Sequence, residues 1–152
     1  MAQYEYDVAV TSRSFSKNTT LRNELQAKYR SVKFNDDGIR FTTESLVEYL
    51  KGCEKAIVAL DPINNEVLKH LPDLKVISKY GVGLNNIDFD SLRENDVLLG
   101  WRGGVNKRAV AELTMAAMLS LSRNLFQQDR ELKEKNWNVI LILILVMVIP
   151  KC

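Results

Sequence analysis

The sequence predicts an α/β fold, a parallel sheet with helices on both of its faces. Short apolar runs alternate along the chain with segments of helical period. Turn and cap signals separate these segments at a spacing that suits strand–helix–strand units. The length of 152 residues, 46% of them hydrophobic, is ordinary for one compact domain. Together these observations favour a sheet that is covered on both faces.

The first predicted strand, helix and second strand follow one another closely. Residues 7–11 form a compact β-branched run that predicts a buried strand. Thr19 or Thr20 can cap a helix in which large apolar residues recur every fourth residue on one face. Residues 32–34 are a brief second strand, which ends at the turn signal in residues 35–38.

The third predicted strand lies between two helices. One helix starts at Thr42 or Thr43 and ends near Gly52, because glycine suits a helix terminus. Residues 56–60 are an uninterrupted apolar run and form the strand. A turn at residues 61–62 then leads into a short helix.

Two further strands and a long helix complete the pattern. Residues 74–78 and 97–100 are the fourth and fifth predicted strands, and the helix extends from about Asn106 to about Asn124. From residue 110 to residue 121 this helix is apolar almost all round, which is typical of a helix buried against another body. The element order fits a flavodoxin-like doubly wound sheet with three α/β/α layers, in which ligands bind beyond the carboxyl ends of the strands.

Composition excludes several functional classes. A net charge of +2 gives no basic surface of the kind that nucleic-acid binders show. Two cysteines, Cys53 and Cys152, cannot build a disulfide framework, and the polar, acidic start of the chain is no secretory signal, so a cytoplasmic protein is expected. The single histidine, His70, leaves little room for histidine-based catalysis or for a metal site.

Residues 79–88, KYGVGLNNID, are the most informative segment after a strand. Gly81 and Gly83 let the backbone adopt positive φ and approach a ligand closely. Consecutive N–H groups in such a turn can form an anion-binding concavity, although the segment equally suits a plain turn. It has no third glycine and is therefore not a dinucleotide fingerprint. Residues 103–113 then form a loop that enters a helix, with Asn106 as a plausible cap at an end that attracts anions.

Asp61 permits a second interpretation of the fold. In a receiver domain, an aspartate after the third strand accepts a phosphoryl group, with acids after the first strand that bind Mg²⁺ and a lysine after the fifth. Here residues 11–13 are Thr, Ser and Arg, and Gly100-Trp-Arg102 stands where the lysine is needed. Asp61 fits better as the start of a turn that the following proline stiffens.

Three ordered motifs carry a family resemblance. The segments KYGVGLNNID, GGVNKRAVAEL and SRNLFQQDRELKEKNW resemble the N-terminal part of the D-isomer-specific 2-hydroxyacid dehydrogenases, the phosphoglycerate dehydrogenase-like branch in particular. The resemblance covers about Tyr6 to Asn138 and implies the flavodoxin-like substrate-binding domain of such an enzyme. It further implies NAD as cofactor, a small 2-hydroxy or 2-keto acid as substrate, and a homodimer formed through residues 125–138. The substrate-binding residues it implies are Tyr80, Gly81, Val82 and Gly83, whose N–H groups face the substrate carboxylate, and Asn106 near the cleft.

Two positions depart from the family pattern within the matched region. Asn85 stands where aspartate is frequent, which removes a charge from the loop. Arg102-Gly103 stands where a Thr-Pro pair is common, which loosens the loop before the helix. Neither change alters the expected fold.

The sequence after residue 138 is a larger departure. The family continues into a Rossmann cofactor domain and the arginine, glutamate and histidine of its chemistry, whereas residues 139–149 are an uninterrupted apolar run. As a helix this run is about 16 Å long against a hydrocarbon core of about 30 Å, so no membrane span is expected. The expected organisation is a substrate-binding domain at 1–124, a dimerisation arm at 125–138 and a foreign tail at 139–152, as in a frameshifted or truncated gene product.

Two functions from different classes follow. The first is the substrate-binding domain, in truncated form, of an NAD-dependent D-2-hydroxyacid dehydrogenase, inactive alone because the catalytic groups are not in the sequence. The second is a non-catalytic module that binds a small carboxylate or a protein partner. Turnover of 2-hydroxy acids with NAD, as opposed to binding without turnover, separates the two.

Overall fold

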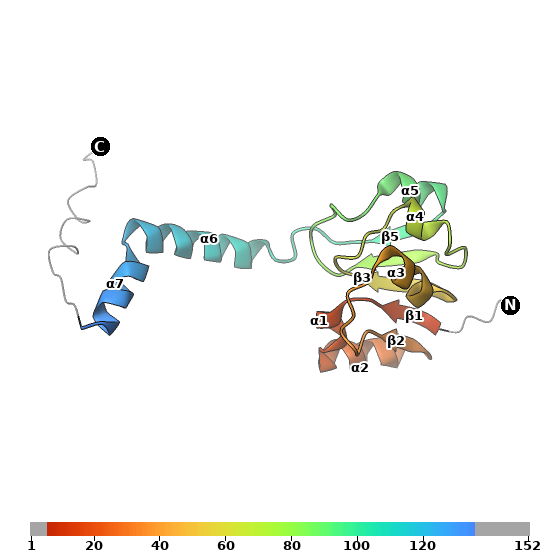
Figure 1. Cartoon of the computed structure of the whole chain (residues 1–152), viewed down its shortest axis with the longest axis horizontal. Helices are drawn as coiled ribbons and strands as arrows, with labels where there is room; N and C mark the ends of the chain where they lie inside the picture. Colours follow the sequence, from red (N-terminus) through yellow and green to blue (C-terminus); the bar gives the residue numbers. More distant parts are fainter. Residues whose placement is uncertain (1–5, 136–152) are drawn as a thin grey trace. The chain divides into compact units, whose positions relative to one another are not determined.

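The computed structural model describes residues 6–135, and the chain divides into two compact units, residues 1–104 and residues 105–152 (Figure 1). The first unit holds a five-stranded parallel sheet. Its strands are β1 (Tyr6–Val10), β2 (Val32–Phe34), β3 (Cys53–Val58), β4 (Val76–Lys79) and β5 (Leu98–Gly100). Its helices are α1 (Arg13–Ser16), α2 (Thr19–Lys28), α3 (Thr43–Leu50), α4 (Asn65–Leu68) and α5 (Phe89–Glu94).

The strand order β2-β1-β3-β4-β5 confirms the predicted doubly wound α/β fold. The chain moves outward from β1 to β2 and then crosses back to β3, so the direction of the connections reverses once. Because crossovers between parallel strands are right-handed, α2 lies on one face of the sheet and α3, α4 and α5 on the other. The helix contacts agree, since α1 packs with α2 while α4 packs with both α3 and α5.

The main core lies between the sheet and the layer of α3, α4 and α5. Ala9 of β1 belongs to this core. Its neighbours Val8 and Val10 are also buried but do not belong to it, because successive side chains of a strand point to opposite faces of the sheet. The helices contribute residues at helical spacing. The buried members of the core from helices, loops and strands include Leu46, Leu50, Val67, Leu68, Leu74, Ala56, Val58 and Ile77.

Several element boundaries differ from those predicted. β3 starts at Cys53 and ends at Val58, so residues 59 and 60 belong to the following loop, where Leu60 is 85% exposed. The cap of α2 is Asn18, whose side chain accepts a hydrogen bond from the N–H of Leu21 at 3.1 Å, and not Thr19 or Thr20. The short helices α1 and α5 were not predicted, because four and six residues carry too little periodicity.

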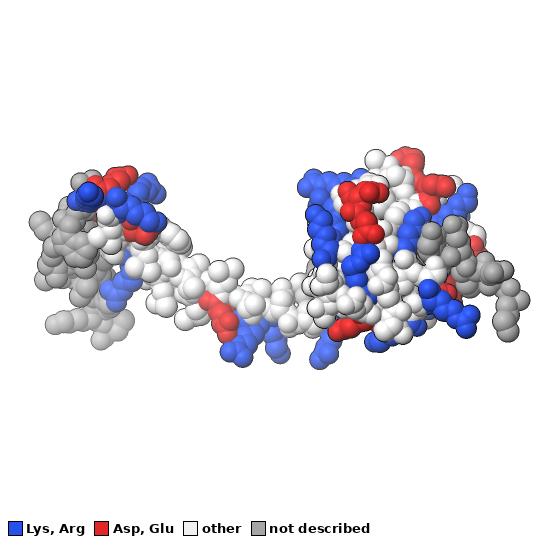
Figure 2. Space-filling model, turned by 90° about the horizontal axis from the view of Figure 1, so that it is seen from below, with Lys and Arg blue, Asp and Glu red and all other residues white. Residues whose placement is uncertain are grey.

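The second unit contains α6 (Lys107–Ser122) and α7 (Leu125–Lys133). They confirm the predicted long helix, and a left-handed residue, Asn124 with φ of 52°, separates the two helices. Within this unit the apolar side chains of α6 are exposed, as the mostly uncharged surface in Figure 2 shows. No helix between residues 6 and 135 is long and apolar enough to cross a membrane. The predicted tail, residues 139–152, lies outside the described residues, and the segment limits 124 and 138 stay predictions.

Asn106 does not cap α6, which corrects the sequence prediction. Its carbonyl oxygen accepts the first helical hydrogen bond, from the N–H of Val110 at 3.0 Å, but its side chain bonds no backbone N–H. Its backbone (φ −106°, ψ 8°) is outside the extended conformation that Ncap residues usually adopt, in which their side chains reach the N–H groups of the first turn.

Thr42, in contrast, caps α3 through a reciprocal capping box. The N–H of Ser45 donates to the Thr42 hydroxyl at 3.3 Å, and the N–H of Thr42 donates to Ser45 Oγ at 2.8 Å. Thr42→Ala is expected to lower the free energy of unfolding by about 1 kcal/mol, because the N–H of Ser45 at the start of α3 loses its acceptor. The matched variant Asn106→Ala should change it by only a few tenths, roughly the effect of a surface substitution. Urea unfolding of both variants checks the difference, and equal effects would contradict the assignment of the cap.

Candidate functional site

The loop after β4, residues 80–83, lies at the edge of the sheet where the strands end. The four predicted residues follow one another in this loop, and the N–H of Tyr80 donates to the carbonyl oxygen of Val58 at 2.8 Å. Gly81 has φ of +136°, which side-chain-bearing residues rarely adopt. Among the described residues, the N–H groups of Gly81, Val82 and Gly83 donate to no protein acceptor. The loop therefore has three consecutive N–H groups without a protein acceptor. The backbone hydrogen bond of Tyr80 to Val58 holds the residue that precedes them.

Lys79 and Asn86 attach this loop to the loop after β3. The Lys79 ammonium group donates to the carbonyl oxygen of Ala59 and, at 2.9 Å, to Asn86 Oδ1. The Asn86 amide nitrogen donates to the carbonyl oxygen of Asp61 at 2.6 Å. The backbone of Asn86 continues the link, since its carbonyl oxygen accepts from the N–H of Ile63 at 2.8 Å. The loop is thus held at both of its ends.

Two aromatic side chains flank the same loop. The Tyr80 ring packs edge-on against Phe15 of α1, with centroids 5.3 Å apart and planes at 82°. The Trp101 indole N–H donates to the carbonyl oxygen of Val82 at 3.3 Å. A Cβ at Gly103 would lie 2.8 Å from the Trp101 ring, so glycine is needed there for the indole to lie in place. Helix α1 and the loop after β5 therefore both contact the loop after β4.

Burial and hydrogen bonding shift the pKa of two charged side chains at this edge of the sheet, Lys79 and Asp88. Partial burial lowers the pKa of Lys79, and attraction by Asp61 partly offsets that effect. Asp88 caps α5, and a hydrogen bond of 2.5 Å from the Ser91 hydroxyl lowers the pKa of its carboxyl group. Lys79 precedes the three free N–H groups in the chain, and Asp88 follows them.

The other predicted residues fall elsewhere. Asn106 and residues 125–135 of the predicted arm belong to the second unit, and residues 136–138 lie outside the described residues. His70 is exposed just after α4. Within residues 6–135 no group of three His, Cys, Asp or Glu residues could hold a metal ion.

Sequence reasoning missed Lys79 and Asn86 as positioning residues. Both stand in the segment KYGVGLNNID, but the partners that give them their role, Ala59 and Asp61, lie 18 to 27 residues earlier in the chain. The signal that could have revealed this role is that the loops after β3 and β4 both lie at the carboxyl ends of neighbouring strands. Chemically, free consecutive N–H groups beside an ammonium can bind a carboxylate, and each charge-assisted hydrogen bond contributes about 1.5–3 kcal/mol.

Comparisons with known proteins agree on one family. The model of the D-isomer specific 2-hydroxyacid dehydrogenase catalytic domain matches residues 8–137. The chain is 28% identical over 95 residues to a glyoxylate reductase of Korarchaeum cryptofilum (strain OPF8), a match that covers 62% of this chain and 29% of the relative. It is 33% identical over 98 residues to a D-3-phosphoglycerate dehydrogenase of Methanocaldococcus jannaschii, covering 64% of this chain and 19% of the relative. The matches thus span less than a third of these curated relatives.

A solved structure shows the same fold. The D-lactate dehydrogenase of Aquifex aeolicus, complexed with NAD and lactic acid, superposes with a TM-score of 0.68 over 86% of this chain and 38% of that chain, at 22% identity. The family model covers most of the chain, from within β1 through β5 and both helices of the second unit. The chain therefore belongs to the D-isomer specific 2-hydroxyacid dehydrogenase family, and it matches the catalytic domain of that family.

Proposed function

We propose that the chain is the substrate-binding domain of an NAD-dependent D-2-hydroxyacid dehydrogenase, and that the N–H groups of residues 81–83 bind the carboxylate of a small 2-hydroxy or 2-keto acid. The observation that carries this proposal is the set of three free donors on a loop whose ends are both attached. Preorganised donors lose little conformational entropy when a ligand binds. Tyr80 contributes by fixing the start of the loop, and Asn106 is proposed to lie near the substrate in the complete site.

The reaction class is supported by the relatives. The two curated relatives are named as a glyoxylate reductase and a D-3-phosphoglycerate dehydrogenase, and the solved structure holds NAD and lactic acid. In this class of reaction, hydride passes between nicotinamide and the carbon that bears the hydroxyl or keto group. The part that this chain would play is to hold the carboxylate, so that this carbon faces the cofactor.

The 152 residues alone are proposed to bind the acid without turning it over. The sequence holds one histidine, His70, and it lies exposed beyond α4 and away from the loop after β4 in the chain. That histidine is therefore not placed to act as a general acid or base at the proposed carboxylate site. A cytoplasmic homodimer, formed through the segment 125–138, completes the proposal, and its mass in solution is measurable by light scattering.

A titration of the isotopically labelled chain tests the carboxylate site. D-Lactate should shift the amide resonances of Gly81, Val82 and Gly83 in a saturable way, because these N–H groups acquire an acceptor. Methyl D-lactate is the matched control, since it keeps the hydroxyl and lacks the carboxylate. Equal shifts with both compounds, or none with D-lactate, would contradict the proposal.

Gly81→Ala should weaken D-lactate binding by about tenfold or more. A Cβ at Gly81 meets only Lys79 Cε at 3.9 Å, so the effect comes from the positive φ and not from crowding. Strain of about 1–3 kcal/mol shifts the loop to another conformation and misaligns its donors. Gly52→Ala is the control, because Gly52 also has positive φ (71°) but precedes β3 at the opposite edge. It should lose stability and keep its affinity for D-lactate.

A further inference from the structure

The indole of Trp101, in the loop after β5, contacts the middle of the loop after β4. Its N–H donates to the carbonyl oxygen of Val82 at 3.3 Å. In the described part of the chain, no other hydrogen bond joins residues 81–83 to the rest of the protein. The residues before and after this stretch, Tyr80 and Leu84, have backbone hydrogen bonds of their own. The orientation of the stretch between them therefore depends on one side chain from a neighbouring loop.

The ring of Trp101 lies against the backbone of Gly103. A Cβ at Gly103 would lie 2.8 Å from Cη2 and 3.1 Å from Cζ2 of the indole, closer than side-chain atoms pack. Any residue with a Cβ at position 103, proline included, would therefore displace the ring. The acceptor at Val82 and the absence of a side chain at Gly103 thus fix the indole at its two ends.

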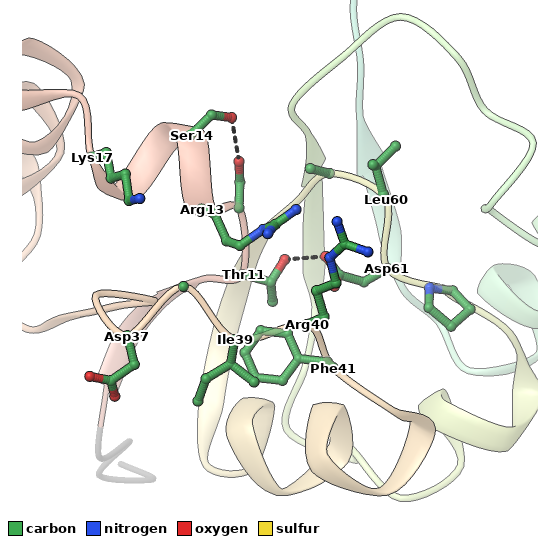
Figure 3. Close-up of a pocket in the computed structure, with 14 residues that line it drawn as sticks. Thr11, Arg13, Ser14, Lys17, Asp37, Ile39, Arg40, Phe41, Leu60 and Asp61 are labelled. Carbon is green, nitrogen blue, oxygen red and sulfur yellow. Dashed lines mark hydrogen bonds between the residues drawn. The ribbon is translucent and has the colours of Figure 1, made fainter.

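This contact lies outside the recess that Figure 3 shows. That recess has a volume of about 740 Å³ and is formed by the loops after β1, β2 and β3. Neither Trp101 nor residues 81–83 line it. A ligand confined to that recess would not touch the indole, so an effect of Trp101 on binding reports on the loop after β4.

The peptide unit between Val82 and Gly83 links the oxygen that Trp101 binds to one of the three free N–H groups. A peptide unit is planar and, throughout the described residues, trans, so that its C=O and N–H point in opposite directions. The hydrogen bond from Trp101 to the Val82 oxygen therefore directs the N–H of Gly83 away from the indole. If this unit turned over, a carbonyl oxygen would take the place of the N–H and would repel a carboxylate.

Glycine at position 83 permits this unit to turn over. Type I and type II turns differ by such a reversal of their central peptide, and the second type needs positive φ at its third residue, which glycine tolerates. Gly83 does not have positive φ in the structure, whereas Gly81 does. Because Gly83 can adopt both signs of φ at little cost, the local chain does not select one orientation of the peptide.

We propose that Trp101 is a positioning residue of the loop after β4, and that its hydrogen bond holds the Val82–Gly83 peptide in the orientation that presents the Gly83 N–H to the substrate carboxylate. The identity of the ligand, a small 2-hydroxy or 2-keto acid, rests on the proposed function. The orientation of the peptide in the ligand-free chain does not depend on that identity. Trp101 acts through the backbone of the loop and needs no contact with the acid.

Residual dipolar couplings of the ¹⁵N-labelled, ligand-free chain test the orientation. Trp101→Phe keeps an aromatic ring and removes the donor, so the coupling of the Gly83 N–H should change as the peptide samples both orientations. Gly103→Ala displaces the indole and should act in the same way. The N–H of Tyr80 is the internal reference, because its hydrogen bond to Val58 does not involve Trp101. An unchanged coupling at Gly83 in both variants, or equal changes at Gly83 and Tyr80, would overturn the proposal.

A double-mutant cycle with D-lactate tests the consequence for binding. Trp101→Phe should weaken D-lactate binding about fivefold, the effect expected of one neutral hydrogen bond. Gly83→Ala disfavours the turned-over peptide, because alanine avoids positive φ, and its Cβ would lie 3.4 Å from Asn85 Oδ1, an ordinary contact. In the Gly83→Ala chain, Trp101→Phe should therefore weaken binding by less than about twofold. The same loss in both backgrounds would mean that Trp101 does not act through this peptide. If Gly83→Ala abolishes binding, the coupling at residue 83 with and without Trp101→Phe decides in its place.

Phe89→Leu is the matched control for the loss of an aromatic donor beside the loop. The Phe89 ring is 47% exposed, against 45% for Trp101, and it forms no contact with another aromatic ring among the described residues. This variant should bind D-lactate as the unsubstituted chain does. If the unsubstituted chain does not bind D-lactate, the carboxylate site is wrong, and the couplings of the ligand-free variants still decide the role of Trp101. If D-lactate binds and neither Trp101→Phe nor Gly103→Ala weakens it, the carboxylate site stands and the role of Trp101 is wrong.

Discussion

Asn35→Ala is expected to lower the free energy of unfolding by about 3 kcal/mol, because a buried side chain with three hydrogen bonds is lost. One of those bonds joins the turn after β2 to Thr11, which follows β1, and the other two close the turn between Asn35 and Ile39. Their removal leaves the carbonyl oxygen of Thr11 without that donor. The N–H of Ile39 also loses its acceptor. Chemical denaturation followed by circular dichroism measures the change.

Asn85→Ala is the control for this prediction. Asn85 is exposed in the loop after β4, and its side chain forms no hydrogen bond with the described part of the chain. Its replacement should change the free energy of unfolding by less than about 0.5 kcal/mol, as at an ordinary surface position. If Asn35→Ala were as mild as Asn85→Ala, the stability of the turn after β2 would not depend on the amide of Asn35.

Leu46→Ala should lower the free energy of unfolding by about 2–5 kcal/mol, since it removes a fully buried side chain from the middle of α3. Alanine and leucine are both good helix formers, so the loss reports packing against the sheet and not helix propensity. Leu60→Ala is the same substitution at a position that is 85% exposed, and its expected effect is below about 0.5 kcal/mol. Thermal unfolding of the pair compares the two.

A result in which Leu60→Ala is the more destabilising variant would contradict the position of the core. It would mean that the apolar run at residues 56–60 is buried to its end, as the sequence alone suggests. The pair therefore also tests where β3 ends, because the structure places Leu60 in the loop after the strand.

Local sequence patterns are sufficient to predict the strands that are buried. Residues 8–10 and 76–77 are apolar in succession, and their strands, β1 and β4, lie in the interior of the sheet. The pattern is misleading at β3, where Glu54 and Lys55 belong to the strand and Leu60 does not. The ends of β3 are decided by its pairing with β1 and β4. A short stretch of sequence does not show which strands will lie beside it.

The candidate site, like the strands, can be predicted from the sequence only in part. The pair Gly81 and Gly83 is visible in the sequence, because a turn with free N–H groups needs residues without side chains. The attachments of the loop are not visible, since Asn86 and Lys79 acquire their partners only when β3 and β4 pair. The attachment of the turn after β2 to Thr11 likewise depends on the amide of Asn35, a residue that the sequence suggests only as part of a turn.

Trp101 gives the loop after β4 an intrinsic optical reporter. Its indole N–H is bonded to Val82, the central residue of the three proposed donors, and the ring is 45% exposed. The sequence has only one other tryptophan, Trp137, so Trp137→Phe leaves a single indole in the chain. Emission from that indole responds to the polarity and hydrogen bonding around it. Carboxylates can therefore be screened by fluorescence, without a cofactor and without any turnover.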